Sequence, residues 1–123
     1  MIKEILIVGA GSAVGGIFRF LTGKLVMQLF QHPFPLATFI INIAGSFLIG
    51  TVYAMFGKSG NMGPTTLLFL ATGICGGFTT FSAFSYENIL LMRNGHYLLS
   101  ITYISGSVLL GLLATLLGYS VAK

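Results

Sequence analysis

The sequence predicts an all-α membrane protein with four transmembrane helices. Its 123 residues are 55% hydrophobic and only 7% charged, whereas soluble domains carry about 25% charged residues. Four apolar stretches reach the roughly 20 residues that a helix needs to cross a bilayer core. The links between these stretches are short and contain proline or glycine, where helices stop.

The four helices are expected at about residues 5–30, 36–56, 65–92 and 97–121 of a single domain, residues 1–123. These ranges leave almost nothing outside the membrane. The first stretch is longer and richer in glycine than a signal peptide, and it lacks a basic start followed by a small-residue cleavage site. It is therefore interpreted as part of the mature protein.

The first stretch contains glycines whose spacing has two interpretations. Gly9, Gly11 and Gly15 resemble a loose dinucleotide fingerprint, which requires an acidic residue about 20 positions later. No acid lies between Glu4 and Glu87, which argues against a nucleotide site. Gly11 and Gly15 have the small-xxx-small spacing that lets helix backbones approach closely in lipid. The same spacing recurs in the second and fourth helices, at Ser46 and Gly50 and at Ser107 and Gly111.

The third stretch contains residues that are poor helix formers. Gly76 and Gly77 are followed closely by Thr79 and Thr80, and all four disfavour helix relative to alanine. In hydrocarbon, freed backbone groups must find partners inside protein or beside water. Interrupted membrane helices can use such groups to hold ions. We therefore expect the third helix to be broken at mid-membrane and to form an ion site.

Two cations fall late in the first helix. A cation at the bilayer centre costs about 2.5–3.5 kcal/mol on insertion scales, so such side chains reach the interface or line a wet cavity. Lys24 is expected to reach the interface. Arg19 lies deeper and serves either as an anion attractor at a pore mouth or as an interfacial anchor.

Basic residues are balanced between the two sides of the membrane. Three lysines share one side, and Arg19, Lys24 and Arg93 share the other. The positive-inside rule therefore selects no orientation. Insertion in both orientations would allow an antiparallel, dual-topology homodimer around a two-fold axis in the membrane plane.

An aromatic stripe with hydroxyl groups follows the glycines of the third helix. Phe78, Phe81 and Phe84 recur every three residues and so share one helix face. Hydroxyl side chains interleave with this stripe, at Thr79, Thr80, Ser82 and Ser85. Such stripes usually serve packing, but the edge of a phenyl ring is electropositive. Ring edges and hydroxyl groups together would suit a small anion.

Polar residues elsewhere are candidates for the same pathway. Asn42 lies in an apolar run, so its amide makes either an interhelical hydrogen bond or a contact to a passing anion. Glu87 either pairs with Arg93 at a solvated helix end or shapes a vestibule. Tyr103 and Ser107 stand at i, i+4 in the fourth helix and either line the pathway or bond to neighbouring backbone.

The residue types argue against several other functions. There is no aspartate, and His32 and His96 lie in links, so no Ser/His/Asp set or paired carboxylates can form an enzyme site. Cys75 is the only cysteine, which excludes an internal disulfide and zinc-type spacing. It is expected to be a small buried apolar residue. The net charge of +4 is too dispersed for a nucleic-acid surface.

Residues 76–87 read Gly-Gly-Phe-Thr-Thr-Phe-Ser-Ala-Phe-Ser-x-Glu. This motif resembles the signature of the Fluc (CrcB) fluoride channels, and Asn42-x-x-Gly45 and the first helix with Arg19 are similar to other parts of that family. The resemblance covers essentially the whole chain. It implies a lipid-embedded, dual-topology antiparallel homodimer with two pores in the bacterial cytoplasmic (inner) membrane, which exports fluoride passively and lowers its toxicity.

The resemblance also implies individual roles. Phe81 and Phe84 match phenylalanines that face the fluoride path, and Asn42 matches the pore asparagine. Positions in the fourth helix match pore-lining residues, and Glu87 matches a vestibule glutamate. The pore candidates are Asn42, Phe81, Phe84, Ser82, Thr80, Tyr103, Ser107, Glu87 and Arg19.

A structural sodium ion, which is not transported, is implied at the dimer centre. Backbone carbonyls of Gly76 and Thr79 would hold it. Residues 76–79 are therefore interpreted as an unwound, cation-holding backbone and residues 80–85 as an anion-facing wall. The chain departs from the family at Ala83, where members often have threonine, so one hydroxyl near the ion path is missing.

Two rival functions remain. A small proton-coupled multidrug exporter also has four helices and can insert in both orientations. It needs an intramembrane carboxylate in its first helix, where Glu4 at the very start is the only acid. A non-conducting assembly subunit would not explain the broken third helix or its hydroxyl and aromatic face.

Overall fold

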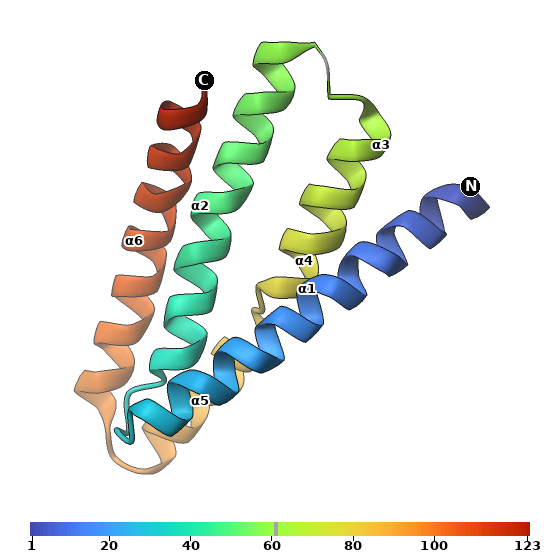
Figure 1. The fold of residues 1–123 in the computed structure, drawn as a ribbon. Coiled ribbons are helices and arrows are strands. Elements are labelled where there is room, and N and C mark those ends of the chain that lie inside the picture. Colours follow the sequence, from blue (N-terminus) through green and yellow to red (C-terminus); the bar gives the residue numbers. More distant parts are fainter. Residues whose placement is uncertain (61) are drawn as a thin grey trace.

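A computed structural model describes residues 1–60 and 62–123 and is all-helical in this part of the chain (Figure 1). Four helical spans of the described residues are long and apolar enough to cross a membrane: Ile2–Leu29, Leu36–Lys58, Pro64–Arg93 and Tyr97–Ala122. The predicted set of four membrane-spanning helices is confirmed at this level. With four such spans, the chain is a multi-pass membrane protein.

Three of the spans are continuous helices, namely α1 (Ile2–Leu29), α2 (Leu36–Ser59) and α6 (Tyr97–Ala122). α1 begins earlier than residue 5, because the Glu4 carboxylate lies in its first turn and 3.2 Å from the amino group of Met1. A negative charge there is favourable against the helix dipole. α2 ends at Gly60, whose φ of 61° is the left-handed conformation that glycine adopts readily.

The third span is built from four pieces. They are α3 (Pro64–Leu67), the π-helix η1 (Leu68–Cys75), α4 (Gly76–Phe78) and α5 (Ser82–Arg93). Pro64 stands in the first turn of α3, where its missing N–H costs nothing. The wider π-helical turns of η1 have no counterpart in the predicted pattern. Such turns are rare and often occur near functional sites.

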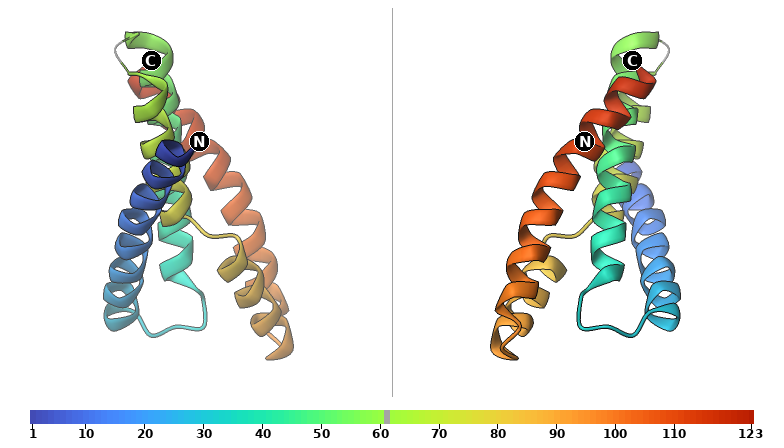
Figure 2. Two further views of the ribbon diagram at one scale, coloured as in Figure 1. Left: turned by 90° about the vertical axis from the view of Figure 1, so that its right-hand side faces the viewer. Right: turned by 90° about the vertical axis from the view of Figure 1, so that its left-hand side faces the viewer.

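The spans are arranged around α2. α2 packs mainly on α6, whereas α1 packs on η1 and α4. Both views of Figure 2 show α1 and α6 diverging toward the end of the molecule where α5 runs beside α6. Both chain termini lie toward the opposite end (Figure 1), as an even number of spans requires.

Glycines allow α1 to cross the third span at very short distance. A Cβ atom at Gly11 would lie 2.7 Å from the carbonyl oxygen of Phe69, and one at Gly15 would overlap the carbonyl oxygen of Ile74. A Cβ atom at Gly77 would lie 2.6 Å from a carbonyl oxygen of α1. The close helix approach predicted from Gly11 and Gly15 is confirmed.

At the contact between α2 and α6, only one of the two predicted glycines makes a close helix approach. A Cβ atom at Gly50 would overlap the carbonyl oxygen of Thr115 on α6. Gly111 makes only an ordinary van der Waals contact to α2, and a Cβ there would fit. The second close approach instead lies at Gly118, against the carbonyl oxygen of Phe47. Gly118 was not predicted, although Ala114 and Gly118 have the same small-xxx-small spacing.

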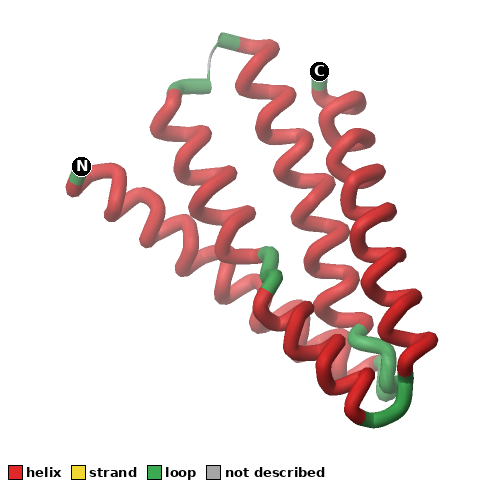
Figure 3. The backbone as a smooth tube through the Cα atoms, turned by 180° about the vertical axis from the view of Figure 1, so that it is seen from behind, coloured by secondary structure: helices red, strands yellow, loops and turns green. Residues whose placement is uncertain are grey.

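Residues 79–81 separate α4 from α5 (Figure 3). Thr79 is extended, with φ −85° and ψ 158°. The hydroxyl of Thr79 donates to the carbonyl of Cys75 over 2.8 Å. The hydroxyl of Thr80 accepts a bond from the N–H of Ala83, in the first turn of α5, over 3.2 Å. These side-chain bonds replace backbone bonds of a continuous helix.

The expectation that the backbone unwinds from Gly76 onward is wrong. Gly76 and Gly77 are helical, in α4, and the non-helical backbone begins at Thr79. The physical reason is packing, because Gly77 faces the backbone of Ser12 on α1 and has no room for a side chain. Gly77 lets α4 approach α1 closely, whereas a Cβ atom at Gly76 would make only an ordinary contact within the third span. The helical backbone ends at Thr79.

Candidate functional site

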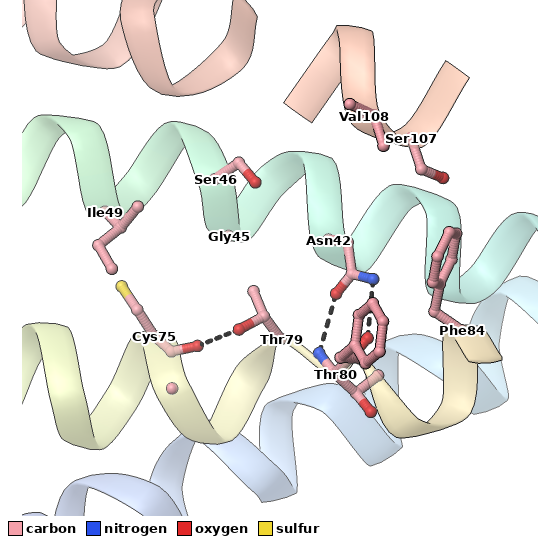
Figure 4. A pocket seen from close by; sticks show the side chains of 12 residues that line it. Asn42, Gly45, Ser46, Ile49, Cys75, Thr79, Thr80, Phe84, Ser107 and Val108 are labelled. Carbon is pink, nitrogen blue, oxygen red and sulfur yellow. Dashed lines mark hydrogen bonds between the residues drawn. The ribbon is translucent and has the colours of Figure 1, made fainter. Parts of the chain in front are cut away.

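A cavity of about 530 Å³ lies beside residues 79–81 and is walled by α2, the third span and α6 (Figure 4). It brings together most of the predicted pore residues and both sodium candidates. Those in its lining are Asn42, Thr80, Phe81, Phe84, Ser107, Gly76 and Thr79. Cys75, buried as expected, also lines this cavity.

Asn42 is bonded to the non-helical backbone on both sides of its amide. Its Nδ2 donates to the carbonyl of Thr80 over 3.0 Å, and its Oδ1 accepts from the N–H of Thr80 over 2.9 Å (Figure 4). The predicted interhelical hydrogen bond is thus present. A primary amide has two N–H groups, so one remains for a ligand in the cavity.

The two predicted phenylalanines lie next to each other. Their ring centroids are 5.8 Å apart with an interplanar angle of 44°. Phe84 also packs on the ring of Tyr103 at 4.9 Å, and Tyr103 packs on Phe34 at 5.3 Å. Among the described residues, the ring of Phe81 has no aromatic neighbour other than Phe84, and Phe81 is 76% exposed in the single chain.

Two serine hydroxyls face this cavity from neighbouring helices. Ser107 on α6 has a buried Oγ without a hydrogen-bond partner among the described residues. A buried hydroxyl that lacks a partner costs free energy unless a ligand or water supplies one. Ser46 on α2 also lines the cavity. It was predicted only as a packing residue, although it lies one helical turn after Asn42, a spacing that indicates a shared face.

A second cavity of about 630 Å³ lies between α1, α2 and α5. Arg19, Lys24, Glu87 and Thr80 line it. The Arg19 Nε donates to the carbonyl of Gly77 over 3.3 Å, so this side chain contacts the α4 terminus while remaining exposed. Thr80 lines both cavities, which places residues 79–81 between them.

Glu87 is held by hydroxyl groups from two other helices. Its Oε2 accepts a bond from Thr38 over 2.6 Å, and its Oε1 accepts one from Tyr103 over 2.7 Å. The alternative pairing with Arg93 is not among the ion pairs of the described residues. Tyr103 is completely buried and lines neither cavity. It packs on Phe84, which lines the first cavity, and donates to Glu87, which lines the second.

Two further polar residues, Ser82 on α5 and Thr38 on α2, lie near these sites. Ser82 is exposed at the start of α5, with its Oγ 3.3 Å from the Oγ1 of Thr80. Thr38 was missed by the sequence argument. The spacing of Thr38, Asn42 and Ser46 along α2 forms an i, i+4, i+8 stripe, which would have indicated one polar face.

The carbonyl oxygens of Gly76 and Thr79 are the atoms assigned to the sodium ion. Among the described residues, no side-chain donor and no backbone donor outside the helices bonds to either oxygen, whereas the carbonyls of Cys75 and Gly77 accept side-chain hydrogen bonds. Carbonyl oxygens suit a hard cation. Residues 1–60 and 62–123 contain no cluster of three His, Cys, Asp or Glu side chains that could hold a metal.

The fold and site together define a class of protein. It is a small four-span membrane protein in which hydroxyl, amide and aromatic groups surround a cavity at an interrupted helix. Residues 6–119 match the family described as CrcB-like protein, Camphor Resistance (CrcB). The chain belongs to this family.

Curated relatives match over nearly the full length of both chains. A protein of Flavobacterium psychrophilum is 45% identical over 121 residues, which cover 98% of each chain. A protein of Gloeothece citriformis is 47% identical over 120 residues, covering 98% of this chain and 97% of the relative. One of Chlorobium phaeobacteroides is 43% identical over 119 residues, covering 97% and 92%. All three are named fluoride-specific ion channel FluC.

Proposed function

We propose that this chain is a fluoride-specific ion channel that lets fluoride leave the cytoplasm passively. The observation that carries the proposal is the near full-length identity to relatives with that name. The cavity at the interrupted helix supplies matching chemistry. Because these relatives are named as ion channels, the protein acts as a channel and not as an enzyme.

Fluoride must exchange its water for other hydrogen-bond donors as it enters a narrow site. The hydroxyls of Thr80 and Ser107 and the remaining N–H of Asn42 are available for this exchange. The edges of Phe81 and Phe84 add electropositive hydrogen atoms without a full charge. Conduction needs binding that is favourable enough for the anion to enter and weak enough for it to leave, and several uncharged donors suit both requirements.

The second cavity is proposed as the vestibule that feeds this path. Arg19 and Lys24 make its wall electropositive, and such charges raise the local concentration of an anion. The Glu87 carboxylate would oppose this effect. Its two hydroxyl donors from α2 and α6 direct O–H dipoles at the negative charge and hold it in place.

The active assembly is proposed to be an antiparallel, dual-topology homodimer with two pores in the lipid of the bacterial inner membrane. The exposure of Phe81, 76% in one chain, supports a second copy, because a pore-wall ring needs cover from lipid. The balanced basic residues support insertion in both orientations.

A sodium ion is proposed between the two copies, held by the carbonyls of Gly76 and Thr79. When bound, it would neutralise carbonyl dipoles that face each other across the two-fold axis and would not be transported. The lack of a side-chain donor at either carbonyl oxygen among the described residues supports this site, although the backbone around Gly76 is helical. The two copies of this chain would supply the ligands.

The multidrug exporter is disfavoured by the position of the acids. Glu4 lies in the first turn of α1 and contacts the Met1 amino group, at the end of the span and not inside it. Glu87 accepts hydrogen bonds from two hydroxyls on other helices. The chain therefore offers no free carboxylate within α1 to couple protons.

The test of the proposed function is anion efflux from liposomes that contain the purified protein. We expect rapid fluoride efflux without a proton gradient and negligible chloride efflux under the same conditions. A proton gradient should leave the fluoride rate unchanged. Equal chloride flux, or export of organic cations that depends on the gradient, would overturn the proposal.

A further inference from the structure

A polar contact outside both cavities joins α5 to α6. Asn88 lies one turn after Phe84 on α5 and is 5% exposed, and Ser100 lies in the first turn of α6 and is completely buried. Neither residue lines a cavity described above, and neither takes part in the pathway derived so far. Burying an amide and a hydroxyl in an apolar helix contact costs free energy unless they are bonded.

The two side chains form a short relay. The Ser100 Oγ donates to the Asn88 Oδ1 over 2.9 Å, and the Asn88 Nδ2 donates to the carbonyl of Phe84 over 2.9 Å. Ser100 is thereby connected to the backbone that carries the Phe84 ring. A second contact, between the tilted rings of Phe84 and Tyr103 with centroids 4.9 Å apart, joins the same two helices close by.

These two contacts fix how α5 is rotated against α6. Ser100 and Tyr103 stand three residues apart and so face the same side of α6, and Phe84 and Asn88 stand four apart on α5. The hydrogen bond from Tyr103 to Glu87 also joins these helices, but it ends on the long, flexible side chain of Glu87 and does not fix the turn that carries Phe84. The buried polar relay ends on the Phe84 carbonyl itself and resists rotation there, because a hydrogen bond is directional and weakens steeply when it is bent.

We propose that Asn88 and Ser100 are positioning residues that set the direction in which the edge of Phe84 faces the anion cavity. This inference rests on the proposed function. Without the relay, α5 samples other rotations and the ring presents its face as well as its edge. The face of the ring is electronegative, so the discrimination between fluoride and a larger, more weakly hydrated anion falls.

The relay is tested by fluoride and chloride efflux from liposomes, reported as a ratio per folded protein. For Ser100→Ala we expect the ratio of fluoride to chloride flux to fall about five-fold, the effect of losing one neutral hydrogen bond. Ser100→Thr keeps the hydroxyl and should restore the ratio. Thr102→Val removes a hydroxyl on the exposed face of α6, which bonds only to Leu98, and serves as the matched control.

The single variant leaves the Asn88 amide unpaired and can fail to fold. The double variant Asn88→Ala with Ser100→Ala removes both partners, which leaves no unsatisfied buried group, and should show the same fall in the ratio. A purely structural role would change the fluoride and chloride fluxes by the same factor and leave their ratio unchanged. The inference would therefore be overturned if the double variant and a folded Ser100→Ala both kept the fluoride-to-chloride flux ratio of Thr102→Val. Absence of fluoride flux in the unmodified protein would instead overturn the proposed function.

Discussion

Phe81 is the residue whose substitution best separates conduction from packing. Phe81→Ile keeps an apolar side chain but removes the ring edge. We expect the fluoride efflux rate to fall about two- to twelve-fold, since aromatic-edge contacts contribute about 0.5–1.5 kcal/mol. The measurement is efflux from liposomes at equal amounts of folded protein. Phe18→Ile, at another exposed phenylalanine but on α1, is the control. An unchanged rate in Phe81→Ile would remove the ring edge from the mechanism.

The sequence indicated which polar residues matter more reliably than it indicated which groups they bond to. Asn42 was recognised because an amide in an apolar run must have a partner, and its partner is the backbone of Thr80. The bond from Thr38 to Glu87 was missed, because it joins residues 49 positions apart that meet only in the folded chain. Tyr103 was expected at the cavity, and it is instead buried behind Phe84.

At the scale of the helices, α1 can cross η1 and α4 so closely because glycines at the crossing have no side chain. Gly15→Ala would bring a Cβ atom onto backbone atoms of Ile74 and Phe78. We expect a loss of about 1–3 kcal/mol in the free energy of unfolding, the usual cost of overpacking. The measurement is denaturation of the detergent-solubilised protein.

Gly16→Ala is the matched control for this crossing. A Cβ at Gly16 would meet nothing within 4 Å, so alanine should be neutral or stabilise by about 0.5–1 kcal/mol through its helix propensity. Equal stability changes at Gly15 and Gly16 would contradict the account of the crossing.

Apolar length predicted the four spans, because crossing a bilayer is a requirement on length and hydropathy alone. The internal structure of the third span was predicted less well. The π-helix η1 has no residue signature. Gly76 and Gly77 are helical, and Gly77 serves the close packing on α1. Glycine favours both outcomes, and only the position of α1 decides between them.

At the scale of the whole molecule, sodium is expected to hold the two copies together. Exchange of sodium for a larger cation should weaken the dimer, because carbonyls spaced for a small ion would bind the larger one less well. The measurement is the dimer fraction in detergent as a function of protein concentration in each salt. A dimer indifferent to the cation would count against the carbonyl site at Gly76 and Thr79.

We propose that fluoride crosses this protein passively through the cavity at the interrupted helix. The reversal potential of the current through the protein tests this in a planar bilayer with a fluoride gradient and equal chloride on both sides. We expect reversal at the equilibrium potential of fluoride, unchanged when a pH difference is imposed. A reversal potential near zero, or one that follows the pH difference, would contradict it.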